Sequence, residues 1–211
     1  MSSVLISSVI ELLSQNKKFP NYQAERRVDI FINHFLERIL TEYLKTPTTY
    51  VCPEFPLKTA NLTQSGKSRN LSTKLDYLCG TLNEIIYVEL KTDDKSIKPE
   101  QLEIYFNNIN WSKCLENFDS LVNGPKRNKD YQNKYNVLSE RITSLRGNSY
   151  LDQARIIYIS PLSKDQRLNI GKYKVINPTP LHEINLKLSE DEIVVWKFLI
   201  EIGINIFELK E

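Results

Sequence analysis

Two acidic residues and a lysine have the spacing needed to do chemistry together in this sequence. Glu89 and Lys91 stand two positions apart in the apolar run EIIYVELKT (84–92), so on a strand their side chains point to the same face. If residues 81–84 connect two strands of a hairpin, Asp76 lies opposite Glu89 on the neighbouring strand. This register predicts that the three side chains converge on one patch.

Two carboxylates and an ammonium group in one patch suit the hydrolysis of a phosphodiester bond. Carboxylates that approach each other repel unless a cation lies between them, and oxygen ligands suit Mg²⁺ or Mn²⁺. Such a cation binds a phosphate and lowers the pKa of a bound water molecule, while a neighbouring lysine stabilises developing charge. A cross-strand salt bridge on an exposed hairpin would give the same pattern without any chemistry, and these three residues alone do not separate the two interpretations.

A pattern further along the chain adds weight to the first interpretation. Gln101 and Tyr105 have the spacing Q-x-x-x-Y, and as an i, i+4 pair they share one face of the helix expected there. Together with Asp76 and the sequence E-L-K at 89–91, this pair resembles the signature of the PD-(D/E)XK nuclease superfamily, in its RecB-type branch. The resemblance covers about residues 23–110, and no known pattern is recognised in the last fifty residues.

The resemblance implies both a fold and an activity. The fold would be an α/β restriction-endonuclease-like core, with a central mixed sheet flanked by helices in the order αβββαβ. The activity would be Mg²⁺- or Mn²⁺-dependent hydrolysis of DNA. Asp76, Glu89 and the carbonyl group of Leu90 would hold the metal, and Lys91 would position or activate the attacking water. The glutamine and tyrosine of the downstream pair would support the site or the DNA strand.

Members of this superfamily also tend to carry a glutamate on the helix before the sheet. Glu25, at the start of the amphipathic segment 23–45, fits that position best as a further ligand of the metal or water. Glu37 is the competitor, roughly 120° around the helix from Glu25. Glu25 could instead only complement the positive end of the helix dipole. Glu54 is a weaker candidate, because solvation at an edge strand explains it.

Other cofactors are not expected. The cysteines Cys52, Cys79 and Cys114 are too few for the four thiolates of the iron–sulfur cluster that some RecB-type relatives hold. The sequence SGKS (65–68) lacks the upstream glycine of a phosphate-binding loop, because Asn61 occupies that position. We therefore expect neither an iron–sulfur cluster nor a nucleotide cofactor.

A basic segment at 123–136, expected to be a loop, is a second candidate for DNA contact. Basic side chains neutralise phosphates and tyrosines can stack on exposed bases, although a solvated loop without a partner would have the same composition. The residues concerned are Lys126, Arg127, Lys129, Lys134, Tyr131 and Tyr135.

The composition is that of an ordinary globular protein. The chain has 211 residues and a formal net charge of +2, which neither requires nor excludes a nucleic-acid partner. We expect one domain over 1–211, with a core at about 23–165 and a C-terminal elaboration at about 166–211. The N-terminal segment (1–15) reads as an amphipathic helix and not as a leader or membrane span. Scattered cysteines favour a reducing, cytoplasmic setting without a membrane partner.

The elements that must position these residues follow from the spacing of apolar residues. Strands are expected within 46–58, at an edge of the sheet, and within 71–81, 84–92 and 154–162. Helices are expected at 23–45, within 96–122 beginning near Pro99, at 137–145, and from the capping box at 189–192 through about 200. A last strand is expected at 204–209.

Two alternatives to a general nuclease remain. The chain could keep a nuclease fold as a DNA-binding or assembly module without catalysis, or it could be a sequence-specific restriction-type endonuclease. The sequence does not distinguish endonuclease from exonuclease cleavage, DNA from RNA, or a monomer from a homodimer or larger complex.

Overall fold

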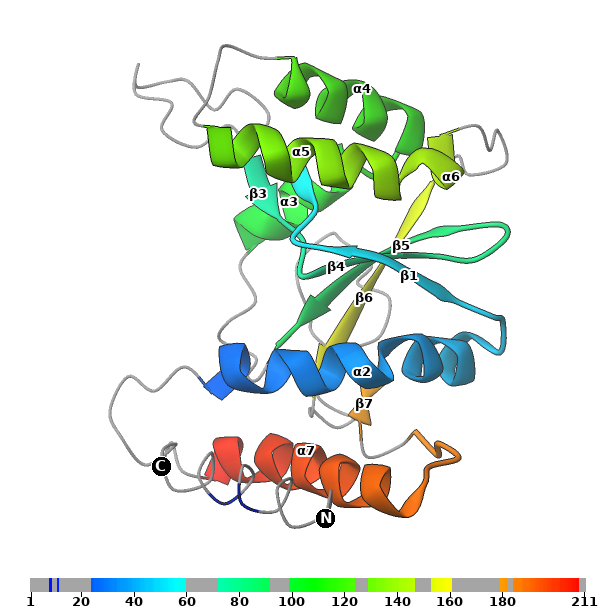
Figure 1. Ribbon diagram of the computed structural model, residues 1–211, viewed down its shortest axis with the longest axis vertical. Coiled ribbons are helices and arrows are strands. Elements are labelled where there is room, and N and C mark those ends of the chain that lie inside the picture. Colours follow the sequence, from blue (N-terminus) through cyan, green and yellow to red (C-terminus); the bar gives the residue numbers. More distant parts are fainter. Residues whose placement is uncertain are drawn as a thin grey trace.

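In the structure, a mixed β-sheet lies between two groups of helices (Figure 1). This computed structural model describes residues 24–59, 72–91, 99–123, 129–146, 153–160, 179–181 and 184–208, together with Ser8 and Glu11. The prediction of a mixed α/β architecture is confirmed. The expected N-terminal helix, apart from Ser8 and Glu11, and Lys126 and Arg127 lie outside the described residues.

Five of the described strands form one sheet in the order β1-β4-β5-β6-β7. β1 and β4 pair antiparallel, as do β4 and β5, whereas β6 runs parallel to both β5 and β7. A separate antiparallel pair, β2 and β3, is inserted between β1 and β4. The strands are β1 Thr49–Pro53, β2 Pro56–Lys58, β3 Ser72–Lys74, β4 Tyr77–Gly80, β5 Ile85–Leu90, β6 Ala154–Ser160 and β7 Thr179–Pro180.

Helices cover both faces of this sheet. α2 and α7 lie on one side, and α3, α4, α5 and α6 lie on the other (Figure 1). The helices are α2 Ala24–Leu44, α3 Pro99–Asn107, α4 Trp111–Val122, α5 Lys129–Arg141, α6 Thr143–Arg146 and α7 Glu190–Glu208. No helix among the described residues has the length and apolar character that crossing a membrane would require.

The β4–β5 hairpin has the register expected from the sequence. The Thr81 N–H donates to the Glu84 carbonyl at 2.9 Å and closes the turn, and Tyr77 then pairs with Val88. Continued by one residue, this register sets Asp76 opposite Glu89. A tight connection leaves few alternative registers, which is why the pairing could be predicted.

β5 is buried along its whole length and divides the core in two. Ile86, Val88 and Leu90 pack against α2 and α7, in a cluster that contains Phe35 and Trp196. The alternate residues of β5 face the other way, into a second cluster beneath α3, α4 and α5; among its members are Tyr87, Tyr105, Trp111 and Phe118. Because side chains alternate along a strand, Glu89 faces this second side, toward α3.

Three expectations for local structure are wrong. The segment 204–209 is not a strand, because α7 continues to Glu208. The segment 123–136 is not a loop throughout, because α5 begins at Lys129, and Tyr135 is buried against Phe118 and cannot stack on a base. The expected helix within 96–122 is two helices, interrupted at 108–110.

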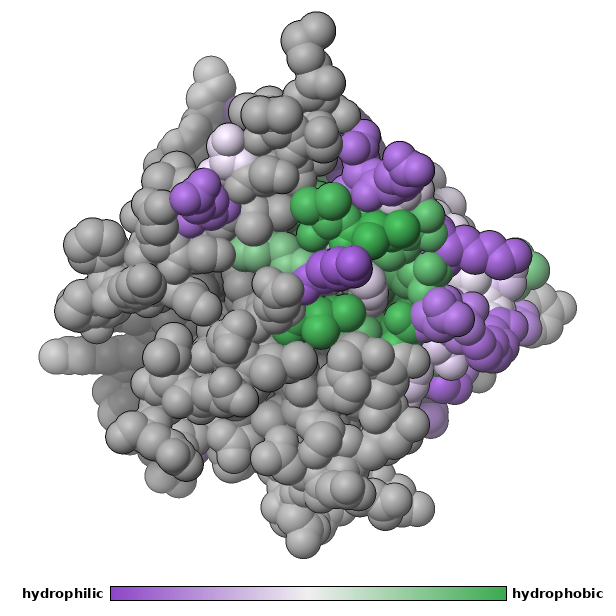
Figure 2. All heavy atoms as spheres, turned by 90° about the horizontal axis from the view of Figure 1, so that it is seen from below, coloured by the Kyte–Doolittle hydropathy of each residue, from purple (hydrophilic) through white to green (hydrophobic). Residues whose placement is uncertain are grey.

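The start of α7 is confirmed as a capping box. The Ser189 Oγ accepts a hydrogen bond from the Glu192 N–H at 3.4 Å, and the Ser189 N–H donates to the Glu192 carboxylate at 3.0 Å. The same carboxylate accepts from Arg38 of α2 at 2.7 Å, which joins the two helices on this side. α7 also exposes Ile193 and Val194, and hydrophobic residues gather on the face seen from below, the side on which α7 lies (Figure 2).

Candidate active site

Asp76 and Glu89 are joined through the backbone of the β4–β5 hairpin. The Asp76 Oδ2 accepts a hydrogen bond from the Leu90 N–H at 2.7 Å, and the Asp76 N–H lies 3.4 Å from the Glu89 Oε1. The two acidic residues are therefore brought together, as the predicted register required.

Glu89 is held by side chains from two elements. It is 1% exposed, and its Oε2 accepts from the Lys91 ammonium at 2.9 Å and from the Gln101 amide at 3.3 Å. Its Oε1 accepts a hydrogen bond from the Tyr105 hydroxyl, which also contacts Gln101. The structure thus brings together Glu89, Lys91, Gln101 and Tyr105, four residues singled out from the sequence.

Burial makes the charged form of this site costly. It raises the pKa of Glu89 from 4.5 to about 7, and the neighbouring charge of Asp76 acts in the same direction. Burial also raises the pKa of Asp76, although the hydrogen bond from Leu90 and the charge of Lys91 oppose the change. A buried carboxylate whose pKa is raised by a second carboxylate favours a positive partner close to both groups.

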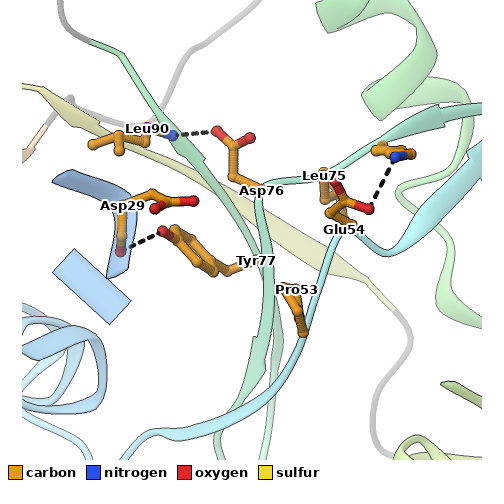
Figure 3. A pocket seen from close by; sticks show the side chains of 8 residues that line it. Asp29, Pro53, Glu54, Leu75, Asp76, Tyr77 and Leu90 are labelled. Atoms are coloured by element: carbon orange, nitrogen blue, oxygen red, sulfur yellow. Dashed lines mark hydrogen bonds and ion pairs between the residues drawn. The ribbon is translucent and has the colours of Figure 1, made fainter. Parts of the chain in front are cut away.

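An open cleft gives solvent access to Asp76. It has a volume of about 690 Å³, and side chains from α2, β3, β4 and the bend after β1 extend into it (Figure 3). Its lining residues are Asp29, Pro53, Glu54, Lys74, Leu75, Asp76, Tyr77 and Leu90. Glu89 and Lys91 are buried and are not among the lining residues, so Asp76 is the member of the acidic pair that the cleft exposes.

Asp29 on α2 is a residue that sequence reasoning missed. It lines the cleft together with Asp76, and its carbonyl oxygen accepts a hydrogen bond from the Tyr77 hydroxyl at 3.0 Å, which ties α2 to β4 (Figure 3). Its charge also contributes to the raised pKa of Asp76. Asp29 stands four residues after Glu25, so the two share one helix face, and that spacing was the available signal.

The glutamates proposed for the helix and the edge strand have different places. Glu25 lies in the first turn of α2, and its side chain is outside what the structure describes. Glu37 is not at the cleft, because its Oε1 accepts the Tyr50 N–H of β1 at 2.7 Å. Glu54 lines the cleft but pairs with Lys74 and Lys134.

The donors available for a cation are oxygen atoms. Asp76, Glu89 and the Leu90 carbonyl group form the set expected from the sequence, and oxygen-only sets with water in the remaining positions suit Mg²⁺. Within the described part of the chain, no group of three or more His, Cys, Asp or Glu side chains is arranged to hold a metal ion. A cation at these donors would have two carboxylates and one carbonyl group as protein ligands and would need water for its remaining positions.

Known proteins offer no further guide to this site. Comparisons of the chain with protein-family models, with curated proteins and with solved structures found no match.

Proposed function

We propose that the chain is a divalent-metal-dependent nuclease that hydrolyses DNA phosphodiester bonds, built on a restriction-endonuclease-like core. One observation carries the proposal: Asp76, Glu89 and Lys91 meet beside an open cleft, and the Gln101–Tyr105 pair holds Glu89. A surface salt bridge would need neither the burial of Glu89 and Lys91 nor this added support.

Asp76 and Glu89 have different roles in the proposed reaction. Asp76 faces the cleft, where the substrate phosphate would lie, and Glu89 is oriented by Lys91, Gln101 and Tyr105. The hydrogen bonds from Lys91 and Tyr105 partly oppose the rise in the pKa of Glu89. A Mg²⁺ ion held by Asp76, Glu89 and the Leu90 carbonyl group would polarise the phosphate and lower the pKa of a bound water.

Lys91 acts on the charge that develops during hydrolysis. The attacking water bonds to phosphorus and gives up a proton to cleft water, and the bond from phosphorus to the leaving oxygen breaks. The leaving oxygen takes a proton from cleft water, so the protons balance. The Lys91 ammonium, 2.9 Å from Glu89, would stabilise the added negative charge on the phosphate.

Metal-dependent cleavage of a substrate panel tests the proposal. The panel contains linear, circular, single-stranded and double-stranded DNA, and we expect cleavage with Mg²⁺ or Mn²⁺ that stops in excess EDTA. The panel also separates sequence-specific cutting, which gives discrete fragments, from general degradation. Turnover in EDTA at the rate seen with Mg²⁺ would contradict the assignment.

The variant Asp29→Asn tests whether α2 contributes to the candidate active site. We expect the variant to lower Mg²⁺ affinity or cleavage about tenfold, because an acidic group beside the ligands is removed. Mg²⁺ titration by calorimetry measures the effect, and Glu37→Gln is the matched control on the same helix, since Glu37 binds the β1 backbone. Equal loss in both variants would mean that the effect is not specific to the cleft.

A nuclease fold that binds DNA without turnover is the second candidate. The observation that favours it is the saturation of Glu89, whose two oxygens already accept hydrogen bonds from Lys91, Gln101 and Tyr105. In that case the substrate panel shows binding and no cleavage with either metal.

A further inference from the structure

Two lysines from distant segments converge on one oxygen atom at the rim of the cleft. Lys74 of β3 donates to the Glu54 Oε2 at 2.9 Å, and Lys134 of α5 donates to the same atom at 2.6 Å. Since both ammonium groups contact one oxygen, they lie close enough to each other to bind a single phosphate group together.

This basic pair adjoins the candidate active site. Glu54 and Lys74 line the cleft with Asp76, and the Glu54 N–H donates to the Asp76 carbonyl at 3.0 Å. The side chains of Lys74, Glu54 and Lys134 are 54%, 55% and 31% exposed, so a ligand in the cleft can reach them. The lysines thus stand beside the place where a phosphate at Asp76 would lie.

Glu54 has an unfavourable backbone conformation, which the contacts around it maintain. Its φ of 48° is in the left-handed region, which residues other than glycine rarely adopt, and such strain tends to occur where surrounding contacts and function require it. The flanking hydrogen bonds, from the Glu54 N–H to Asp76 and from the Leu75 N–H to the Phe55 carbonyl at 2.9 Å, maintain the bend. The hydrogen bonds from Lys134 and Lys74 lower the pKa of Glu54, so its carboxylate stays charged as their counterion.

We propose that Lys74 and Lys134 bind a backbone phosphate of the nucleic-acid strand, next to the phosphate that lies at Asp76, and that this phosphate replaces Glu54 as their partner. The inference rests on the proposed function for the identity of the strand. An exposed carboxylate–lysine pair contributes little free energy, so the exchange of one anion for another costs little. The two non-bridging oxygens of a phosphodiester match two converging ammonium groups.

The salt dependence of DNA binding tests this site without any cleavage. Binding of a fluorescent single-stranded or duplex oligonucleotide is followed by anisotropy in EDTA, between about 50 and 200 mM salt. We expect the double variant Lys74→Ala with Lys134→Ala to reduce the slope of log K against log salt by about 0.7 for single strands or about 0.9 for duplex, the value for one phosphate contact. Each single variant reduces the slope by a smaller amount. Lys113→Ala, an exposed lysine of α4 outside the cleft lining, is the matched control and leaves the slope unchanged.

Glu54→Gln gives the opposite effect. We expect its DNA affinity to rise severalfold at low salt, because the anion that competes with the phosphate for the two lysines has lost its charge. A fall in affinity, or no change, would show that Glu54 is not displaced and would overturn the proposal.

Thermal unfolding of each variant separates binding from a structural role. Lysine variants that melt earlier but keep the wild-type salt slope would show that the pair only fastens α5 to the bend after β1, which overturns the inference. If the wild-type chain cleaves DNA but the lysine variants keep the wild-type salt slope, the phosphate site is wrong and the proposed nuclease activity stands. If the slopes fall as expected but no substrate is cleaved with Mg²⁺ or Mn²⁺, the phosphate site stands and the proposed nuclease activity fails.

Discussion

Lys91→Ala is expected to lower Mg²⁺-dependent DNA cleavage by about a factor of 10³, the size of effect seen when a group that stabilises transition-state charge is removed. Lys91 is 7% exposed and its ammonium lies 2.9 Å from Glu89, so the variant removes the cation nearest to the acidic pair. The measurement is the initial rate of oligonucleotide cleavage at saturating Mg²⁺. Lys113→Ala, an exposed lysine on α4, should keep the wild-type rate.

The same variant also damages the fold, and the experiment must separate the two effects. Removal of one partner from a buried ion pair leaves an uncompensated charge and typically costs about 3–5 kcal/mol. The double variant Glu89→Gln with Lys91→Met removes both charges, and its amide can still accept the hydrogen bond from Tyr105. We expect the double variant to unfold at higher urea concentration than Lys91→Ala while remaining inactive.

Recovery of activity together with stability in the double variant would contradict this role. In that case the loss in Lys91→Ala came from unfolding, and the buried pair would be a structural salt bridge. Cleavage by folded Lys91→Ala at the wild-type rate would also show that Lys91 has only a structural role.

The central part of the fold could be predicted because its signals are local. The segment predicted as a helix at 23–45 is α2 (Ala24–Leu44), and the apolar runs at 84–92 and 154–162 contain β5 and β6. The register of Asp76 against Glu89 followed from the turn at 81–84 alone. Near-continuous apolar runs are typical of strands buried on both faces, and both β5 and β6 have this character.

The errors arose where local pattern and tertiary packing disagree. The run INIFEL alternates as a strand would, yet it continues α7, since adding residues to an existing helix costs less than starting a new element. The composition of 123–136 is that of a loop, but the chain is helical from Lys129, and Tyr135 and Leu138 of this helix are buried in the second core cluster. β7 is two residues long and includes a proline, too short for a sequence signal.

For the site, the grouping of the acidic residues, the lysine and the helical pair was predictable, and the cleft was not. Asp76, Glu89, Lys91, Gln101 and Tyr105 carry their signal in residue type and spacing. The roles of Asp29 and of the Lys74–Lys134 pair depend on which segments meet in space. Lys134 comes from the part of α5 that was expected to be a loop, and Lys74 comes from a strand pair inserted into the sheet order. Contacts between segments that are distant in the sequence produce no residue spacing from which they could be predicted.

In the absence of a divalent cation, the protein is expected to lose stability as pH rises from about 4.5 to about 7. The pKa of Glu89 is raised from 4.5 to about 7 by burial and by Asp76, so within this window the unfolded chain releases a proton that the folded chain retains. Each step up in pH therefore favours the unfolded state until Glu89 ionises in both states. The full shift corresponds to a loss of about 3 kcal/mol, since one pKa unit is about 1.4 kcal/mol.

The other carboxylates with shifted pKa values in the described part of the chain do not reverse the sign within this window. The pKa of Asp76 is also raised, so its contribution has the same direction and begins at lower pH. Glu54 and Glu192 have lowered pKa values, and the stability that they contribute is lost only as pH falls below about 4.5. The decline toward neutral pH thus belongs mainly to the buried pair of carboxylates.

Urea unfolding in EDTA at several pH values measures this decline, and Glu89→Gln should flatten it although the variant is less stable overall. Addition of Mg²⁺ should restore stability above pH 7, where both carboxylates are charged, and should have little effect near pH 5, where Glu89 is protonated. A cation that stabilised the protein equally at both pH values would bind elsewhere. The pH dependence of the Mg²⁺ effect therefore locates the metal at Glu89 without a measurement of activity.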